Sequence, residues 1–341
     1  MSSTLVLGAT GFTGRWLLLA LLGRGVPVAA AVRGGSARDA GLRRWLRDHG
    51  ADDRALVTVA ADITRPCLGL TPADEELLGD VRDVFNTAAL YRFGLTAEEA
   101  RPVNADGARN VVHWSATRPR LRRLVHLSGY RVSQEARLDG PRLYAELGAY
   151  EASKTEGDAA VRLTAPQLGV PLTVVNPSSV IGHSATGEAG QYIGLAGIVE
   201  QLWTGRLPAL PGSRRTFVPV VTVDYLAEFL ASVTELDQDP VHRHWVLDPA
   251  TPCLPDLVAL LADHLGVRAP RLTLPVGLIR RLPRTLTGAD PETLGFLSEE
   301  RYDTGSADRL ARAAGLRHPP VEQALRHWAS RLVADEFGRA A

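Results

Sequence analysis

Two residues of this chain have the types and the spacing to move a proton. Tyr150 and Lys154 stand four positions apart in the stretch Tyr-Glu-Ala-Ser-Lys. On a helix this spacing places both side chains on one face, so the ammonium can approach the phenol. A nearby positive charge favours the phenolate and lowers the pKa of a tyrosine, which fits the phenol for proton exchange with a carbonyl or an alcohol.

The lysine of this pair is unusual in itself. Of the 38 basic residues, Lys154 is the one lysine and all the others are arginine. Arginine replaces lysine where only a surface charge is needed, but it cannot replace a compact ammonium whose pKa can be tuned. Seven tyrosines are spread over 341 positions, so one falls four residues before the lysine by chance only about 2% of the time. We therefore expect Tyr150 and Lys154 to be catalytic.

A glycine-rich loop near the N-terminus has the pattern of a nucleotide site. Gly8, Gly11 and Gly14 follow an apolar strand and open a helix. Missing side chains permit a tight turn, close approach of the backbone to a pyrophosphate and close packing of helix on sheet. The helix N-terminus offers free N–H groups to the phosphates. The residues expected in this loop are Gly8, Thr10, Gly11, Phe12, Thr13 and Gly14.

The end of the second strand indicates which cofactor binds. A carboxylate at this position would bind the ribose 2′-hydroxyl of NAD. This chain has Arg33 there instead, and the next carboxylate after the strand is that of Asp39. A guanidinium can stack on adenine and pair with a 2′-phosphate, so NADP(H) is favoured, with Arg38 as a second contact. Further cofactor contacts are expected at the ends of the third and fourth strands, at Asp62, Ile63, Thr87, Ala88 and Ala89.

Apolar strands alternate with amphipathic helices through the first half of the chain. The expected strands are 4–7, 26–32, 56–61, 84–86, 124–127 and 172–175, and the helices between them include 16–22, 98–116 and 150–168. This alternation predicts an α/β fold with a doubly wound parallel Rossmann sheet. We expect residues 1–182 to form the nucleotide-binding domain, with 221–239 returning to it. Residues 183–220 and 240–341 would form a smaller, mostly helical substrate-binding part.

These motifs together resemble the extended short-chain dehydrogenase/reductase family. The resemblance rests on the glycine loop, Asp62-Ile63, the segment 86–89, the Tyr150/Lys154 pair and Asn-Pro-Ser-Ser-Val at 176–180. It implies that Tyr150 is the acid/base and that Lys154 lowers its pKa and holds the nicotinamide ribose. It also implies that Pro177, Ser178, Ser179 and Val180 flank the nicotinamide. Segments 180–188 and 217–225 are similar, more loosely, to the thioester and fatty-acyl reductase branch.

The sequence departs from the family pattern at the position that usually supplies a third catalytic hydroxyl. Where the family has a Ser-Ser or Ser-Thr pair after the fifth strand, this chain has Ser128-Gly129. Ser128 is the leading candidate, and Ser133, Tyr130 or no donor at all stay open. We expect Tyr91, Tyr130 and Tyr192 to contact the substrate. The region 183–219 holds apolar residues that fit an apolar pocket or ordinary core packing equally well, namely Tyr192, Leu195, Ile198 and Trp203.

Composition excludes several other classes of function. The formal net charge is zero, which gives no electrostatic reason to expect nucleic acid or a membrane surface as partner. The basic stretch 118–123 is interpreted as a solvated loop. The chain lacks a run of about 20 apolar residues and a signal-peptide pattern. Cys67 and Cys253 are expected to be reduced, with no metal bound and a cytoplasmic location. A homodimer stays open.

Three functions remain in competition. The leading hypothesis is reduction by NADPH of a carbonyl in a largely apolar small molecule or an acyl thioester. The second is epimerisation or dehydration of a nucleotide sugar with bound NAD, against which Arg33 argues. The third is a redox sensor that binds NADP(H) without turnover, against which the lone Lys154 beside Tyr150 argues.

Overall fold

The computed structural model describes residues 2–92, 94–132, 140–279 and 294–339. The chain forms two compact units. The first consists of residues 1–176, 226–245 and 305–316, and the second of residues 177–225, 246–304 and 317–341. The sequence had assigned residues 305–316 to the substrate-binding part, whereas their contacts lie in the first unit.

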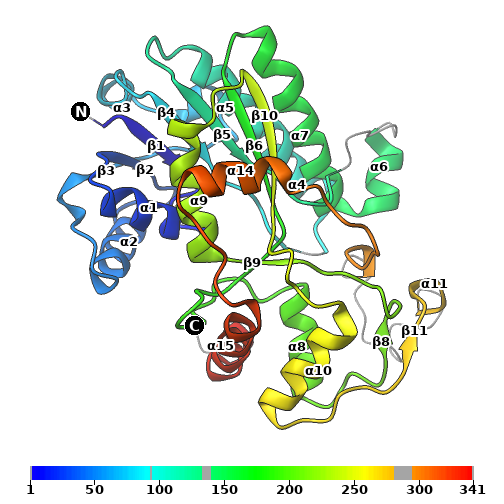
Figure 1. Cartoon of the computed structure of the whole chain (residues 1–341). Coiled ribbons are helices and arrows are strands. Elements are labelled where there is room, and N and C mark those ends of the chain that lie inside the picture. The colour runs from blue at the N-terminus through cyan, green and yellow to red at the C-terminus, as the bar shows by residue number, and fades with distance from the viewer. Residues whose placement is uncertain (1, 93, 133–139, 280–293, 340–341) are drawn as a thin grey trace. The chain divides into compact units, whose positions relative to one another are not determined.

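A seven-stranded sheet forms the centre of the first unit (Figure 1), in the order β10-β6-β5-β4-β1-β2-β3. The pairings of β1 with β2 and β4, of β2 with β3, and of β5 with β4 and β6 are parallel. The strands are β1 (Thr4–Leu7), β2 (Val28–Ala31), β3 (Leu56–Val59), β4 (Asp83–Asn86), β5 (Arg123–Leu127), β6 (Leu172–Pro177) and β10 (Val241–Val246). The predicted α/β, doubly wound parallel sheet is confirmed. Its order reverses between β1 and β4, where such folds bind ligands.

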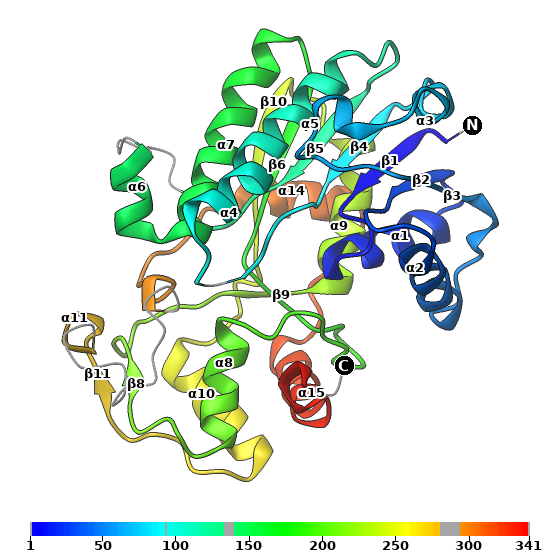
Figure 2. The ribbon, with the colours of Figure 1, turned by 180° about the vertical axis from the view of Figure 1, so that it is seen from behind.

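Helices cover both faces of this sheet, which explains its apolar strands. Every residue of β1, β2 and β4 is buried, as expected for strands packed on both sides. One face carries α1 (Phe12–Gly23), α9 (Val223–Leu236) and α14 (Gly305–Ala313), seen in front of the sheet in Figure 1. The other carries α4 (Ala97–Arg101), α5 (Gly107–Ala116) and α7 (Ala149–Gln167), seen in front in Figure 2.

The predicted continuous helix 98–116 is wrong in its middle. A π-helical segment, Pro102–Asp106, separates α4 from α5. Pro102 has no N–H to donate to the preceding turn, so regular α-helical pairing is interrupted there. Such π segments occur often at functional sites. The remaining short elements of this unit are α2 (Ser36–Asp48), α3 (Pro72–Leu77), α6 (Gly140–Leu147) and the 3₁₀ turns Asp53–Ala55 and Pro66–Gly69.

The second unit has its own apolar core between three helices. These are α8 (Leu195–Trp203), α10 (Leu254–Leu265) and α15 (Val321–Ala334), and their buried faces include Leu257 and Leu325. Two short parallel pairings accompany them, β7 (Ser179–Ile181) with β9 (Val220–Thr222) and β8 (Leu210–Pro211) with β11 (Thr273–Leu274). The described part of this unit also contains a single turn, α11 (Val276–Ile279), and a 3₁₀ turn at Glu336–Gly338.

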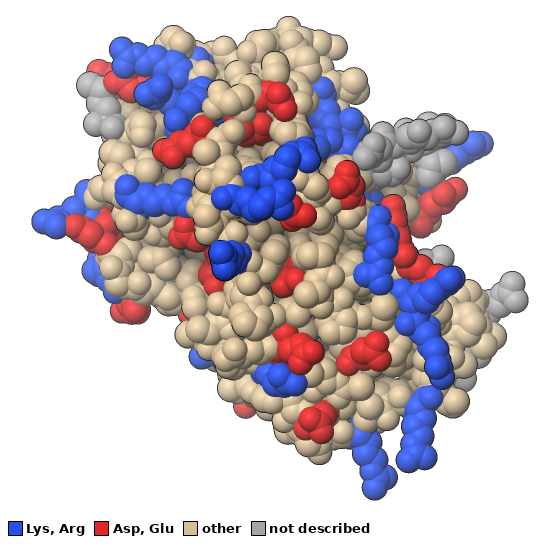
Figure 3. All heavy atoms as spheres, in the orientation of Figure 1, with Lys and Arg blue, Asp and Glu red and all other residues tan. Residues whose placement is uncertain are grey.

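Many of the described charged side chains form ion pairs, such as Arg24 with Glu228 and Arg120 with Asp80. Acidic and basic side chains alternate over the elements of the first unit in Figure 3. The predicted solvated loop 118–123 is confirmed in its middle, where Pro119, Arg120 and Arg122 are exposed, but not at its two ends. Arg118 stacks on Trp114 and pairs with Glu75, and the buried Arg123 binds Thr173. Among the described helices, none has the length and apolar character that a membrane span requires.

Candidate functional site

The glycine loop is shaped by close backbone contacts. Gly8 has a φ of +78°, and a Cβ there would lie 2.6 Å from the Ala88 nitrogen. A Cβ on Gly14 would overlap the Gly8 carbonyl oxygen. Gly11 caps α1 with extended backbone and without a side-chain hydrogen bond, so the first N–H groups of the helix stay available to a ligand. This bare cradle at a helix N-terminus fits a pyrophosphate.

The residues expected around the adenosine lie close together. Arg33 is exposed at the end of β2, and the exposed Arg38 donates to its carbonyl oxygen at 3.2 Å. Burial raises the pKa of Asp62, but hydrogen bonds from Thr64, with the nearby positive charge of Arg33, outweigh it and lower that pKa. Ile63 is buried, and its carbonyl accepts a 2.9 Å hydrogen bond from Asn110. An exposed guanidinium is therefore present where a 2′-phosphate could reach it.

The end of β4 is tied to β1 and β5 by polar side chains. The Thr87 hydroxyl donates to the Leu7 carbonyl at 2.7 Å, so it holds the strand ends together. Asn86 lies 3.1 Å from His126 Nδ1 and accepts from the Ala88 N–H. Burial, assisted by Lys154, lowers the pKa of His126 to about 3, so this imidazole is neutral. Ala88 is half-buried and Ala89 is exposed, which leaves space beside the glycine loop.

Lys154 is buried on α7, and its ammonium is held at the end of β5. Its Nζ donates to the Leu127 carbonyl oxygen at 2.8 Å, and the side chain is 6% exposed. Burial lowers the pKa of Lys154 to about 8, partly opposed by the carboxylate of Asp158. Tyr150 lies one turn earlier on the same helix. Its ring is met edge-on by Tyr91, whose pKa is raised to about 12 by burial.

The turn after β5 is fixed at almost every residue. The Ser128 N–H donates to the Val175 carbonyl, the Gly129 carbonyl accepts from Asn176 at 2.8 Å, and the Tyr130 carbonyl accepts from Trp245 at 3.0 Å. The buried Ser128 hydroxyl, in contrast, has no hydrogen-bond partner within the described residues. Since buried hydroxyls are nearly always paired, this one is a candidate donor for a ligand. Ser133 lies outside the described residues.

Two polar contacts that hold this site were missed from the sequence. Asn104, on the π segment, bonds the Leu90 N–H and carbonyl and donates to the Ser153 hydroxyl at 3.0 Å. Gly157 permits this approach, because a Cβ there would overlap the Asn104 carbonyl oxygen. Glu151, next to Tyr150, is buried and accepts from Arg131 at 3.2 Å. Asn104 belongs to no recognisable sequence motif, so the sequence gives no signal of this role.

The other predicted site residues belong to the second unit. Pro177 ends β6, Ser178 follows it, and Ser179 and Val180 lie in β7, where the Ser179 N–H donates to the Pro219 carbonyl. The Tyr192 hydroxyl donates to Asp335 at 3.2 Å. Their cofactor and substrate contacts stay predictions. Leu195 and Ile198 are buried in the core of that unit, so core packing explains them, whereas Trp203 is 40% exposed.

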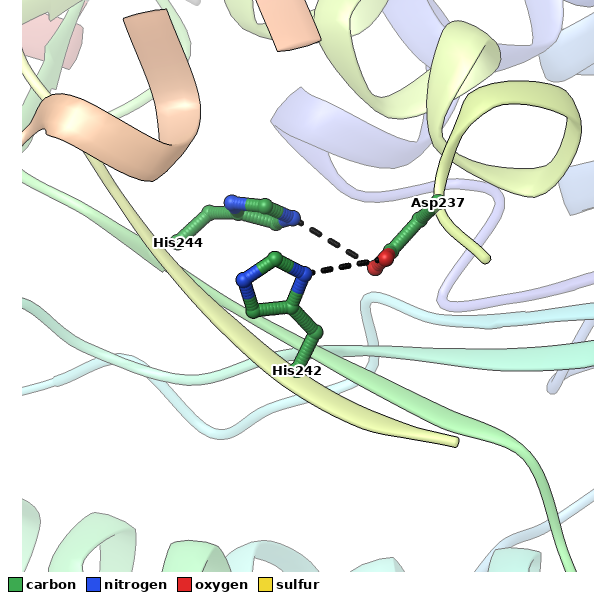
Figure 4. A group of neighbouring side chains, drawn as sticks. All are labelled: Asp237, His242 and His244. Atoms are coloured by element: carbon green, nitrogen blue, oxygen red, sulfur yellow. Dashed lines mark hydrogen bonds and ion pairs between the residues drawn. The ribbon is translucent and has the colours of Figure 1, made fainter. Parts of the chain in front are cut away.

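A second polar cluster joins β10 to the end of α9 (Figure 4). Asp237 lies 3.0 Å from His242 Nδ1 and 3.4 Å from His244 Nε2. The donor types would suit a transition metal. However, the Asp237 carboxylate also accepts from Thr173 at 2.5 Å and lies 3.7 Å from the Arg123 guanidinium. A guanidinium that shares the carboxylate opposes a divalent cation, so we interpret the cluster as an ion-paired clasp.

A known family matches the part of the chain that contains the glycine loop, the turn after β5 and the buried lysine. Residues 6–230 match the family described as Male sterility protein, an NAD-binding family. This chain belongs to that family. It is accordingly an extended short-chain dehydrogenase/reductase with an NAD(P)-binding domain, as the sequence predicted.

Relatives of this family member differ in their chemistry. The chain is 26% identical over 291 residues to a carboxylic acid reductase of Segniliparus rugosus, covering 72% of this chain and 24% of that protein, so it spans about a quarter of that relative. The terminal R domain of the myxalamid PKS-NRPS pathway is similar in fold, with a TM-score of 0.79 and 22% identity over 100% and 92% of the two chains. A UDP-glucuronic acid 4-epimerase of Bacillus cereus has a TM-score of 0.67 and 15% identity over 96% and 99%.

Proposed function

We propose that this chain is an NADP(H)-dependent reductase that acts on the carbonyl of a largely apolar substrate, with an acyl thioester as the favoured class. The observation that carries the proposal is the one lysine of the chain, buried one turn from Tyr150 and bonded to Leu127. Burying an ammonium costs free energy, so its retention indicates use. A redox sensor without turnover would not require this pair.

Different residues of the first unit would bind different parts of the cofactor. The α1 N-terminus would hold the pyrophosphate, Arg33 the 2′-phosphate, and Lys154 the nicotinamide ribose. The bound NADPH would supply the hydride. Arg33 favours this cofactor over NAD and so argues against a nucleotide-sugar epimerase.

The chain's own groups would handle the carbonyl oxygen and its proton. As hydride adds to the carbonyl carbon, negative charge develops on the oxygen. The Ser128 hydroxyl, which has no partner among the described residues, would donate to that oxygen, and Tyr150 would give it a proton. With a thioester, the product of these two steps is a hemithioacetal. As its carbon–sulfur bond breaks, the hydroxyl proton is lost and the sulfur takes up a proton, which releases a thiol and leaves an aldehyde. The thioester preference rests on the carboxylic acid reductase relative and on the R-domain fold.

The test is turnover of purified chain with NADPH against a panel of substrates. The panel contains a medium-chain acyl-pantetheine thioester, the matching aldehyde, a ketone and UDP-sugars, with NADPH oxidation and products both measured. Oxidation of NADPH with the thioester or the aldehyde supports the proposal. Conversion of a UDP-sugar without net NADPH oxidation would support the epimerase alternative instead.

A further inference from the structure

Resting on this proposed function, we propose that Asp158 is a positioning residue for Lys154, the buried counter-charge that keeps its ammonium protonated. Both residues lie on α7, four positions apart, so their side chains share one face of the helix. Asp158 is fully buried, at 0% exposure. Asp158 therefore lies one turn beyond Lys154 and two turns beyond Tyr150 along the same helix.

The carboxylate of Asp158 is contacted by two arginines through one of its oxygens. Its Oδ2 accepts from Arg162 Nε at 2.7 Å and lies 3.7 Å from Arg243 Nη2. Its Oδ1 has no hydrogen-bond partner within the described part of the chain. A buried carboxylate with an uncommitted oxygen can act on a neighbouring ammonium with little screening by water.

Other charged groups around Lys154 cannot supply this counter-charge. His126, on β5, is neutral, because burial and Lys154 lower its pKa to about 3. Glu151 is engaged by Arg131. On the side of α4 and α6, Glu156 accepts from Arg101 and from Tyr144.

A carboxylate on the π segment is also engaged by arginines. Asp106, on the π segment, pairs with Arg101 and with Arg109 of α5. The net effect at Lys154 is a lowering of its pKa by burial that Asp158 opposes. Without Asp158, the ammonium would lose its proton at a lower pH, and with it the positive charge that holds Tyr150 ready for proton transfer.

The single lysine makes a direct measurement possible without any enzymatic assay. Protein grown with lysine labelled with ¹³C at Cε gives one side-chain resonance, whose pH titration reports Lys154 alone. The wild-type midpoint is expected near pH 8. In Asp158→Asn the midpoint should fall by about 1 unit or more, the size of shift that a close opposite charge produces. Glu156→Gln removes a carboxylate from the same helix and should leave the midpoint unchanged.

The direction of the shift separates electrostatics from a loosened fold. Exposure of Lys154 to water would raise its midpoint toward the ordinary value of about 10.4, opposite to the expected fall. A midpoint that rises or stays in Asp158→Asn therefore overturns the proposal. If Asp158→Asn does not fold, Arg162→Gln should raise the midpoint by about 0.5 unit by removing a competing cation, and no rise would overturn it. The titration needs no substrate, so it tests the role of Asp158 even if the protein proves not to reduce a carbonyl.

Discussion

The ring of Tyr91 meets the ring of Tyr150 edge-on, with 4.9 Å between their centroids and 77° between their planes. Edge-to-face aromatic pairs add about 0.5–1.5 kcal/mol beyond the area that they bury. Tyr91 follows β4 and Tyr150 belongs to α7. The contact therefore joins the loop after β4 to Tyr150, the residue proposed to transfer the proton.

This contact predicts different outcomes for two substitutions of Tyr91. Tyr91→Phe keeps the ring and should leave kcat/KM within about twofold of wild type, whereas Tyr91→Leu removes the edge contact and should lower it by about 3- to 10-fold. Steady-state kinetics with the reduced substrate checks both. If Tyr91→Phe falls as far as Tyr91→Leu, the Tyr91 hydroxyl acts on the substrate and the packing account fails.

The Ser128 hydroxyl has no partner in the described ranges of the chain, and its proposed role predicts a loss confined to turnover. Ser128→Ala should lower kcat by about 10²–10³, the effect of losing one donor to a developing oxyanion, with little change in NADPH affinity. Ser115→Ala is the matched control, because the Ser115 hydroxyl on α5 is also buried without a described partner. A silent Ser128→Ala with a crippled Ser133→Ala or Tyr130→Phe would move the assignment to that residue.

Gly129 gives a complementary gain-of-function prediction. A Cβ on Gly129 would lie 3.7 Å from the Val132 side chain, which is ordinary contact. Gly129→Ser should therefore fold and would restore the second hydroxyl of the family's usual pair. We expect its melting temperature to match wild type within a few degrees, about 1 kcal/mol or less. It should also retain much of its turnover when Ser128→Ala is added, and a double variant as inactive as Ser128→Ala alone would argue against a donor at this turn.

Arg33 predicts the choice of cofactor. Wild-type protein should bind NADPH at least about tenfold more tightly than NADH, equivalent to about 1.4 kcal/mol. Arg33→Asp should reverse that order, because a carboxylate repels the 2′-phosphate and can bind a ribose hydroxyl. Arg44→Asp, at an exposed position on α2, provides the charge-matched control. Equal affinities for NADPH and NADH in calorimetry of the wild type would refute the assignment.

The Asp237 clasp predicts a loss of stability that depends on pH. Asp237→Asn leaves the buried Arg123 without its carboxylate and should cost about 3 kcal/mol. Asp239→Asn, whose side chain is 67% exposed, should cost little. Burial raises the pKa of Asp237, but hydrogen bonds from His244, Thr173 and His242 outweigh it and hold that pKa well below its usual range. The stabilisation is therefore present above about pH 4 and is lost in acid, so the difference in Tm should shrink there.

Local patterns predicted the parallel sheet and the helix that carries Tyr150 and Lys154, because each depends on residues close together in the chain. Alternating apolar strands and the spacing of Tyr150 and Lys154 are of this kind. The role of Asn104 could not be predicted, since it depends on a π segment that brings its amide to Leu90 and Ser153. The ion pairs of Arg118 and Arg123, at the two ends of the loop 118–123, could not be predicted either, because Glu75 and Asp237 lie at distant positions in the chain. Long-range pairing leaves no periodic signal in the sequence.

The most direct test of the central claim follows the hydride itself. NADPH deuterated at the transferable C4 position is incubated with the protein and an acyl-pantetheine thioester, and the products are examined by mass spectrometry. The account predicts deuterium on the former carbonyl carbon of the aldehyde or alcohol in wild type, and no labelled product in Tyr150→Phe or Lys154→Arg. Unlabelled products, or labelling that persists in Tyr150→Phe, would contradict it.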